Sequence, residues 1–249
     1  MAALVLIHGA GDSSAVWGKQ VEYFSGRDPV LAVDLPGHGS RLGELGLDRH
    51  EKNAQEICRA MDAQGLSRAV VAGHSMGGAV ALMMALEHPE RLQGMVLVAS
   101  GARMKMRPDF LEQSRQAAEA FGRQIPSSTH IIPVEQMVHP EIPVSVVAWL
   151  QERIGKASAQ ATYADFQANN NFDVMNRLSE IKTPTLVVGG SDDRMAPQKF
   201  TDFLASSISG SRLEVLAPGG HYPMVEQAER FNRVLEVFLA NLDSKESNS

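Results

Sequence analysis

The sequence has a single cysteine, Cys58, among its 249 residues. This excludes an intrachain disulfide and fits a reducing compartment. No apolar run approaches the roughly 20 residues that a membrane-spanning helix needs. The opening MAALVLIHGAG is apolar, but it lacks the charged start of a secretory signal and leads directly into a His-Gly turn, which predicts a buried strand. We therefore expect a soluble, cytoplasmic protein.

The chain also has no cluster or stripe of basic residues. Its 23 Lys and Arg are outnumbered by 29 Asp and Glu, which gives a net charge of −6 and argues against a nucleic-acid partner. No cluster of residues has metal-ligand spacing. The GAGDSS segment at 9–14 lacks the lysine of a phosphate-binding P-loop. We expect no metal and no cofactor.

What the sequence does have is enough apolar residues, 44%, to build one sizeable core. Short apolar runs alternate with helical patterns, which predicts an α/β fold with a parallel sheet flanked by helices. The expected strands are 3–8, 30–34, 69–73, 94–99, 185–189 and 212–216. The expected helices between and after them are 15–24, 48–64, 76–88, 198–207 and 223–240.

The gap between the fourth and fifth expected strands is too long for one crossover. Prolines divide it into short pieces, with helical patterns at about 108–121, 143–155 and 158–170. Such an insertion predicts a helical cap over the strand ends. We place this cap at 103–172, inserted into a core formed by 1–102 and 173–249.

A G-x-S-x-G motif, Gly73 to Gly77, lies where a strand is expected to turn into a helix. To point its hydroxyl out of so tight a turn, Ser75 must adopt a positive φ, and side chains two residues away would collide. The helix N-terminus that follows favours an oxyanion. The alternative is a simple helix cap, which explains a serine but neither glycine.

A serine nucleophile needs a base and an acid that orients the base. His221, in GGHYP after the last expected strand, lies at the required end of the sheet, and the preceding strand is followed by two candidate acids, Asp192 and Asp193. The oxyanion would be held by the N–H groups of Met76 and of Ala10, which follows the first strand. The order Ser, Asp, His along the chain is that of α/β-hydrolases.

Five segments together resemble the α/β-hydrolase superfamily: HGAG at 8–11, DLPGHG at 34–39, GHSMGG at 73–78, GGSDDRMAP at 189–197 and GGHYPMVE at 219–226. The resemblance implies the α/β-hydrolase fold and a structural role for the DLPGHG loop. The chain starts too late for the usual antiparallel strand pair, so about six strands are expected rather than eight. This short start resembles small esterases of the plant methyl-esterase and hydroxynitrile-lyase branch, and some bacterial C–C lyases of menaquinone synthesis.

The resemblance also selects the acid. Related families place it four residues before a proline that begins a helix, and counting back from Pro197 gives Asp193. Ser75, Asp193 and His221 are therefore the expected triad. A dehalogenase would need Asp at the nucleophile, and a hydroxynitrile lyase would need lysine where this chain has Tyr222.

We expect a serine hydrolase that cleaves a carboxylic ester, or a thioester, of a small and largely apolar substrate through an acyl-enzyme. Cleavage of a C–C bond by the same triad remains an alternative, as does a receptor-like binding protein on a hydrolase scaffold. Methionines and aromatic residues near the triad or in the cap are expected to line the substrate pocket. These are Trp17, Met104, Phe110, Met137, Trp149, Met195 and Met224.

Overall fold

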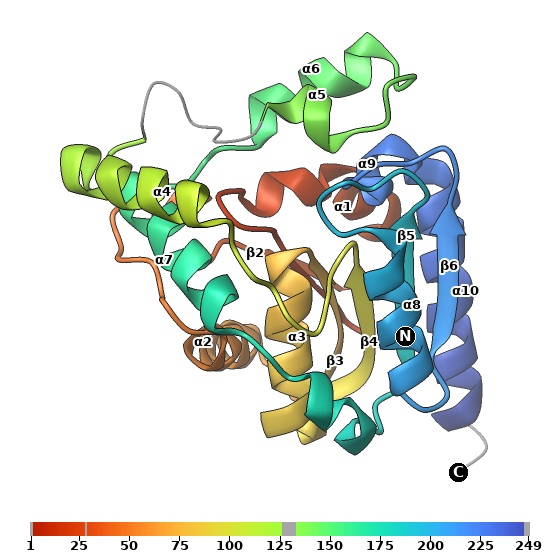
Figure 1. Cartoon of the computed structure of the whole chain (residues 1–249). Helices are drawn as coiled ribbons and strands as arrows, with labels where there is room; N and C mark the ends of the chain where they lie inside the picture. The colour runs from red at the N-terminus through yellow and green to blue at the C-terminus, as the bar shows by residue number, and fades with distance from the viewer. Residues whose placement is uncertain (1, 28, 126–132, 247–249) are drawn as a thin grey trace.

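The six predicted strands form one parallel sheet. The computed structural model describes residues 2–27, 29–125 and 133–246, and it orders the strands β2-β1-β3-β4-β5-β6 (Figure 1). Every neighbouring pair is parallel, so the predicted sheet is confirmed. The bounds are β1 Leu4–Ile7, β2 Val30–Val33, β3 Ala69–His74, β4 Leu92–Val98, β5 Thr185–Gly190 and β6 Arg212–Leu216.

The helices of the core also follow the predicted ranges closely. One difference is at the C-terminal end, where the predicted single helix is divided into α9 and α10 at Gln227. The core helices are α1 Gly18–Phe24, α2 His50–Ala63, α3 Met76–Glu87, α8 Gln198–Ser207, α9 Pro223–Glu226 and α10 Ala228–Glu246. Short 3-10 turns are η1 Ser14–Trp17, η2 Gly39–Arg41, η3 Pro89–Arg91 and η4 Met175–Glu180.

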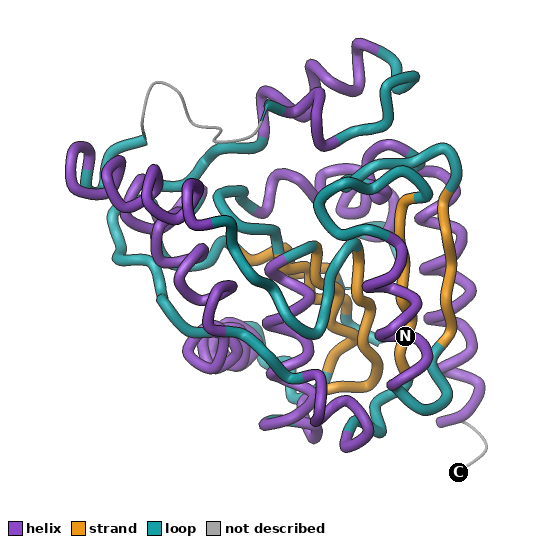
Figure 2. Tube along the Cα trace, viewed as in Figure 1, coloured by secondary structure: helices purple, strands orange, loops and turns teal. Residues whose placement is uncertain are grey.

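Side chains alternate along each strand between two buried layers. In β1, Leu4 and Leu6 face the layer that includes α1 and α10, whereas Val5 and Ile7 face the layer that includes α2, α3 and α8. A parallel sheet covered on both faces needs apolar residues at every position of its central strands, as the uninterrupted apolar runs predicted. Figure 2 shows the strands enclosed by helices, with loops at their ends.

The long insertion between β4 and β5 is helical, as predicted. It contains α4 Pro108–Phe121, α5 Val134–Met137, α6 Val144–Arg153 and α7 Ala159–Asn171, of which the short α5 was not expected. In Figure 1, α4 and α7 lie together at the left of the view, and α5 and α6 lie apart from them at the top. An isolated antiparallel bridge joins Arg103 to Asp173, next to the cap boundaries that we propose.

The strand order places the site at one end of the sheet. The chain passes from β1 to its neighbour β2 and then returns to β3 on the other side of β1. At such a switch point the loops leaving the strands diverge, and the carboxyl ends of β1 and β3 border a crevice. The HGAG and GHSMGG segments leave these two strand ends. No helix in the described part of the chain is long and apolar enough to cross a bilayer.

Candidate active site

Ser75 is the single residue between β3 and α3, and its backbone has the positive φ that the motif predicted. Its φ is +51°, and its N–H donates to the Val98 carbonyl at 2.8 Å. Ser75 is the N-cap residue of α3, yet its side chain makes no capping hydrogen bond. The helix-cap alternative therefore does not account for this serine.

The flanking glycines are required because backbone crowds the turn from two directions. A Cβ at Gly73 would lie 2.0 Å from the Gly77 carbonyl oxygen, so this pair does collide across the turn as expected. A Cβ at Gly77 would lie 2.4 Å from the Ile7 carbonyl oxygen. The second contact brings the start of α3 directly onto the end of β1. It was not foreseen, because it depends on strand order.

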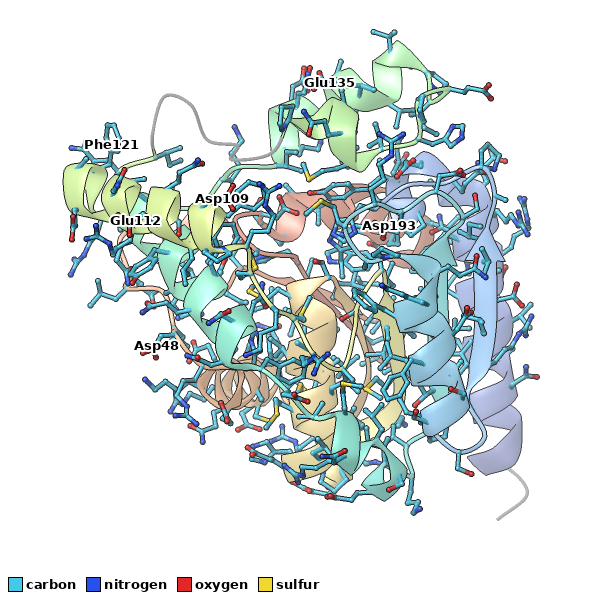
Figure 3. All side chains as sticks on the ribbon, viewed as in Figure 1. Asp48, Asp109, Glu112, Phe121, Glu135 and Asp193 are labelled. Atoms are coloured by element: carbon cyan, nitrogen blue, oxygen red, sulfur yellow. The ribbon has the colours of Figure 1, made fainter. Side chains whose placement is uncertain are left out.

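His221 and Asp193 lie side by side. The Nδ1–H of His221 donates to Asp193 Oδ2 at 2.9 Å, and both side chains are buried. His221 follows β6 and Asp193 follows β5, so two neighbouring strands bring them together. Figure 3 labels Asp193 on the loop after β5, at the end of the sheet nearest the cap helices.

The two adjacent aspartates have different surroundings. Asp193 Oδ1 accepts from the N–H groups of Met195 and Ala196, which fixes the carboxylate toward His221. The Asp192 side chain is 48% exposed and lies 3.6 Å from His139 Nε2. Of the two candidates, Asp193 is the one paired with His221. Pro197 itself is the N-cap of α8 rather than its first residue.

The pair has the electrostatics of a charged acid beside a histidine. Burial alone would raise the pKa of Asp193, but the charge and hydrogen bond of His221 lower it overall. Burial alone would lower the pKa of His221, but the Asp193 carboxylate raises it overall. Because Nδ1 donates its proton to a carboxylate, neutral His221 carries its free lone pair on Nε2.

The loop after β1, which we call the oxyanion loop (residues 8–11), packs against the serine turn. A Cβ at Gly9 would lie 2.9 Å from His74 Nδ1, so only a glycine fits there without a shift. Ala10 is partly exposed, and Met76, at the start of α3, is buried. The two expected oxyanion donors thus come from adjacent segments of the backbone.

Comparison with known proteins identifies the family of the chain. Residues 4–234 match the model of the alpha/beta hydrolase family. The chain belongs to this family. It is 30% identical over 236 residues to a pimeloyl-[acyl-carrier protein] methyl ester esterase of Nitrosomonas europaea, covering 92% of each protein. It is also 30% identical over 263 residues to a 2-hydroxy-6-oxo-6-phenylhexa-2,4-dienoate hydrolase of Comamonas testosteroni, covering 95% of this chain and 87% of that protein.

Comparison with a solved structure gives the same family on the basis of the fold. A thermophilic esterase from Thermogutta terrifontis superposes with a TM-score of 0.86 at 25% identity, covering 97% of this chain and 90% of that one. The predicted α/β-hydrolase fold, with its six-stranded sheet, is thereby confirmed. The chain is a hydrolase of this family, and its substrate is a separate question.

Two of the residues predicted to line the hydrolase pocket belong to the core instead. Trp17 and Met224 have no exposed surface, and the Trp17 ring packs 6.2 Å from that of Phe231 on α10. A side chain without accessible surface cannot contact a substrate in this conformation, so these two assignments are corrected. The remaining members are at least partly exposed: Met104, Phe110, Met137, Trp149 and Met195.

His74, the variable residue of the motif, supports His221 in a way the sequence analysis missed. Its Nε2–H donates to the His221 carbonyl oxygen at 2.8 Å, and the two rings lie 4.9 Å apart. Burial lowers the pKa of His74 to about 3, so the ring is neutral. Strand alternation puts His74 on the same face of β3 as Ala72, toward α9, and this is the signal that could have found it.

A second group missed by the sequence analysis is buried beside His221. The Tyr222 hydroxyl donates to Asp12 Oδ2 at 3.1 Å, and both residues are almost wholly buried. Burial raises the pKa of Asp12 to about 7 despite that hydrogen bond. The charge on Asp12 in turn contributes to raising the pKa of His221.

The His221 loop is also attached to the cap. The His221 N–H donates to the Met137 carbonyl at 2.7 Å, and Glu226 Oε2 accepts from the N–H groups of both Gly220 and His139. A Cβ at Gly220 would lie 2.6 Å from the Met137 carbonyl oxygen. The glycine before His221 therefore admits the cap backbone.

Within the described residues, no group of three or more His, Cys, Asp or Glu side chains is placed to hold a metal ion. The expectation that the enzyme uses neither metal nor cofactor stays a prediction. The chemistry that the described site offers is that of a hydroxyl, an imidazole and a carboxylate.

Proposed function

We propose that the enzyme hydrolyses a carboxylic ester of a small, largely apolar substrate through an acyl-enzyme on Ser75. One observation carries the proposal. A serine with φ of +51° and no capping bond follows β3, and the ring of the preceding His74 lies 4.9 Å from that of His221, whose Nδ1 lies 2.9 Å from a buried carboxylate. Acyl transfer requires a serine hydroxyl that is free to react and an imidazole that a carboxylate orients.

The proposed reaction has two halves. Ser75 Oγ bonds to the ester carbonyl carbon as its proton moves to His221 Nε2, and the carbonyl oxygen takes the negative charge. The N–H groups of Ala10 and Met76 stabilise this oxyanion. The C–O bond then breaks, and His221 gives the proton to the departing alkoxide, which leaves as an alcohol.

Water completes the proposed cycle. His221 Nε2 takes a proton from water, the hydroxide oxygen bonds to the acyl carbon, and collapse of the second tetrahedral intermediate releases the carboxylic acid. The proton returns to Ser75 Oγ. Asp193 stays ionised throughout, holding the imidazole tautomer and stabilising the imidazolium.

A second candidate is hydrolysis of a C–C bond by the same residues. The similarity to a 2-hydroxy-6-oxo-6-phenylhexa-2,4-dienoate hydrolase, at 30% identity, favours this over other reactions of the fold. Thioester cleavage is a further variant of acyl transfer, and the esterase relative supports including methyl esters. We also keep as proposals the small-molecule partner, the absence of a nucleic-acid partner and the cytoplasmic location.

The test is turnover on a graded panel. It contains p-nitrophenyl esters of increasing acyl length, a methyl ester, a lactone, a thioester and the dienoate substrate of the relative. Rates on esters that exceed the rate on the dienoate support the proposal. Faster cleavage of the dienoate would favour the C–C hydrolase, and absence of turnover on every member would favour a receptor-like protein.

A further inference from the structure

A buried ion pair links the cap to the oxyanion loop. On α7, Asp165 points out of the cap, and its Oδ2 lies 2.9 Å from His38 Nε2 in the core. The same oxygen accepts from the Gly11 N–H at 2.8 Å. The His38 and Asp165 side chains are 1% and 2% exposed. Gly11 directly follows Ala10, the proposed oxyanion donor.

The hydrogen bonds of His38 fix its protonation state. Nε2 faces the Asp165 carboxylate, and Nδ1 faces the Pro36 carbonyl oxygen at 3.0 Å. Both partners are acceptors, so both ring nitrogens must donate, and only the imidazolium carries two N–H groups. Burial alone would lower the pKa of His38, but Asp165 raises it overall.

The neighbouring His8 has the opposite arrangement. Its Nδ1–H donates to the Gly9 carbonyl oxygen at 2.8 Å, while its Nε2 accepts from the Leu35 N–H at 3.2 Å. One nitrogen that donates and one that accepts define a neutral ring. Burial lowers the pKa of His8 to about 4. Of these two rings, 4.7 Å apart, His38 is therefore the charged one.

We propose that Asp165 and a doubly protonated His38 form an ion pair that positions the oxyanion loop, so that α7 of the cap controls the rate of acyl transfer through Gly11. This rests on the proposed function, because it assigns a role in forming the oxyanion site. Neither residue touches the reacting atoms. Asp165 holds the Gly11 N–H and His38 holds Asp165. Fixing the Ala10–Gly11 peptide restricts the backbone dihedrals of Ala10, and these relate it to the preceding Gly9–Ala10 peptide, which carries the Ala10 N–H.

The pair makes the positioning dependent on pH. The ionisable groups that face His38 are Asp165 on α7, His8 at the end of β1, and Asp12 after the oxyanion loop. The pair is intact while His38 is protonated. As pH rises through the raised pKa of His38, one of its two hydrogen bonds is lost and Asp165 is left as an unpaired buried charge. The rate should therefore fall on the alkaline side.

The first experiment compares Asp165→Asn with a matched control on the same helix. Asn169 Oδ1 accepts from His50 Nε2–H at 3.0 Å, a buried bond that also joins α7 to the core but does not touch the oxyanion loop. We expect Asp165→Asn to lower kcat about tenfold, part of the loss seen when an oxyanion donor is removed, with little change in KM. Asn169→Ala should keep kcat.

Two outcomes of this comparison overturn the inference. If Asp165→Asn keeps the wild-type kcat, the oxyanion loop does not depend on the ion pair. If Asn169→Ala loses as much activity as Asp165→Asn, the loss comes from weaker packing of α7 on the core and not from a displaced oxyanion loop. A wild-type enzyme that neither cleaves esters nor reacts with a fluorophosphonate instead defeats the proposed function.

The second experiment begins with the wild-type enzyme, so its first part does not depend on a variant that folds. Proton–nitrogen correlation NMR of the wild-type imidazoles at neutral pH should give His38 two protonated nitrogens and His8 one, and a singly protonated His38 overturns the inference. In a pH series, His38→Gln should abolish the alkaline fall in kcat, because glutamine donates without titrating. An alkaline fall with an unchanged midpoint in this variant would also overturn it.

Discussion

Ser75 and Ser158 both occupy the N-cap position of a helix, but Ser158 caps its helix and Ser75 does not. The Ser158 backbone is extended, and its Oγ accepts from the Ala161 N–H at 3.1 Å. Ser75 has φ of +51° and leaves its helix without a side-chain cap. A serine that gives up a capping bond worth about 1 kcal/mol, in a strained backbone conformation, is displayed for another purpose.

The two serines therefore make a matched test of the nucleophile. Ser75→Ala should abolish ester turnover and labelling by a fluorophosphonate, with little change in the melting temperature. Ser158→Ala should do the reverse, keeping both reactions while losing about 1 kcal/mol of unfolding free energy. Mass spectrometry measures the fluorophosphonate label on both variants. Label that persists in Ser75→Ala would assign the nucleophile elsewhere.

Gly73 should tolerate no side chain. A Cβ there would meet the Gly77 carbonyl oxygen at 2.0 Å, whereas a Cβ at Gly43 would meet nothing within 4 Å. We expect Gly73→Ala to lower the unfolding free energy by roughly 2–4 kcal/mol through overpacking, and Gly43→Ala to change it little. Denaturant unfolding of both variants measures this. Equal stability of the two would mean that the serine turn can open to admit a methyl group.

The sheet and the serine turn could be predicted because each depends on residues close together in the sequence. An apolar run defines a buried strand by itself, and Gly73 and Gly77 lie on either side of the residue whose backbone they permit. The choice between Asp192 and Asp193 needed more than a local pattern. It came from the resemblance to related families, and the contact of Asp193 with His221 agrees with it.

Other features could not be predicted because they depend on how distant segments meet. Nothing in the sequence of α7 marks Asp165 as the partner of His38, 127 positions away. Trp17 was assigned to the pocket as an aromatic residue near the expected triad. Its ring instead packs against Phe231 of α10, which lies near the other end of the chain. Apolar composition does not distinguish a pocket from a core.

The pH dependence of ester hydrolysis should have an acid limb that reports His221. Only neutral His221 can accept the serine proton, so the rate rises as pH increases through its pKa. Asp193 raises that pKa despite burial, which puts the midpoint above the ordinary value of about 6.5. Measuring kcat/KM against pH gives the midpoint. A midpoint below the ordinary value would contradict the ion pair seen between these residues.

Asp12 provides the control for this assignment, since its pKa of about 7 lies in the same range. Its charge is one of the causes that raise the pKa of His221. Asp12→Asn should therefore move the acid limb to lower pH and keep its shape. If the limb disappears in Asp12→Asn, the titrating group is Asp12.

The cap should set the preference for acyl length. Met104, at the start of the insertion, and Trp149, on α6, are partly exposed side chains that pack against different core clusters. Together with Phe110 on α4, they are expected to contact the acyl chain. Replacing Met104, Phe110 or Trp149 by alanine should change the ratio of rates on short and long esters more than it changes the melting temperature. Uniform loss on all esters with a large drop in melting temperature would identify core residues instead.

The sharpest test of the proposed triad separates Asp193 from its neighbour Asp192. Asp193→Asn keeps the shape of the side chain but removes the charge that orients His221 and stabilises the imidazolium. The Asp193 carboxylate is buried, and two backbone N–H groups hold it toward His221. We expect kcat to fall by about 10³–10⁴.

Asp192→Asn is the matched control, one residue away and with the same chemical change. Its side chain is half exposed and lies beside His139, where solvent screens the interaction, so kcat should stay within about twofold of wild type. Asp193→Asn should also move the acid limb to lower pH, because neutral His221 no longer has a carboxylate to favour its charged form. If Asp192→Asn is the damaging change, the acid is Asp192. The contact between Asp193 and His221 would then be structural only.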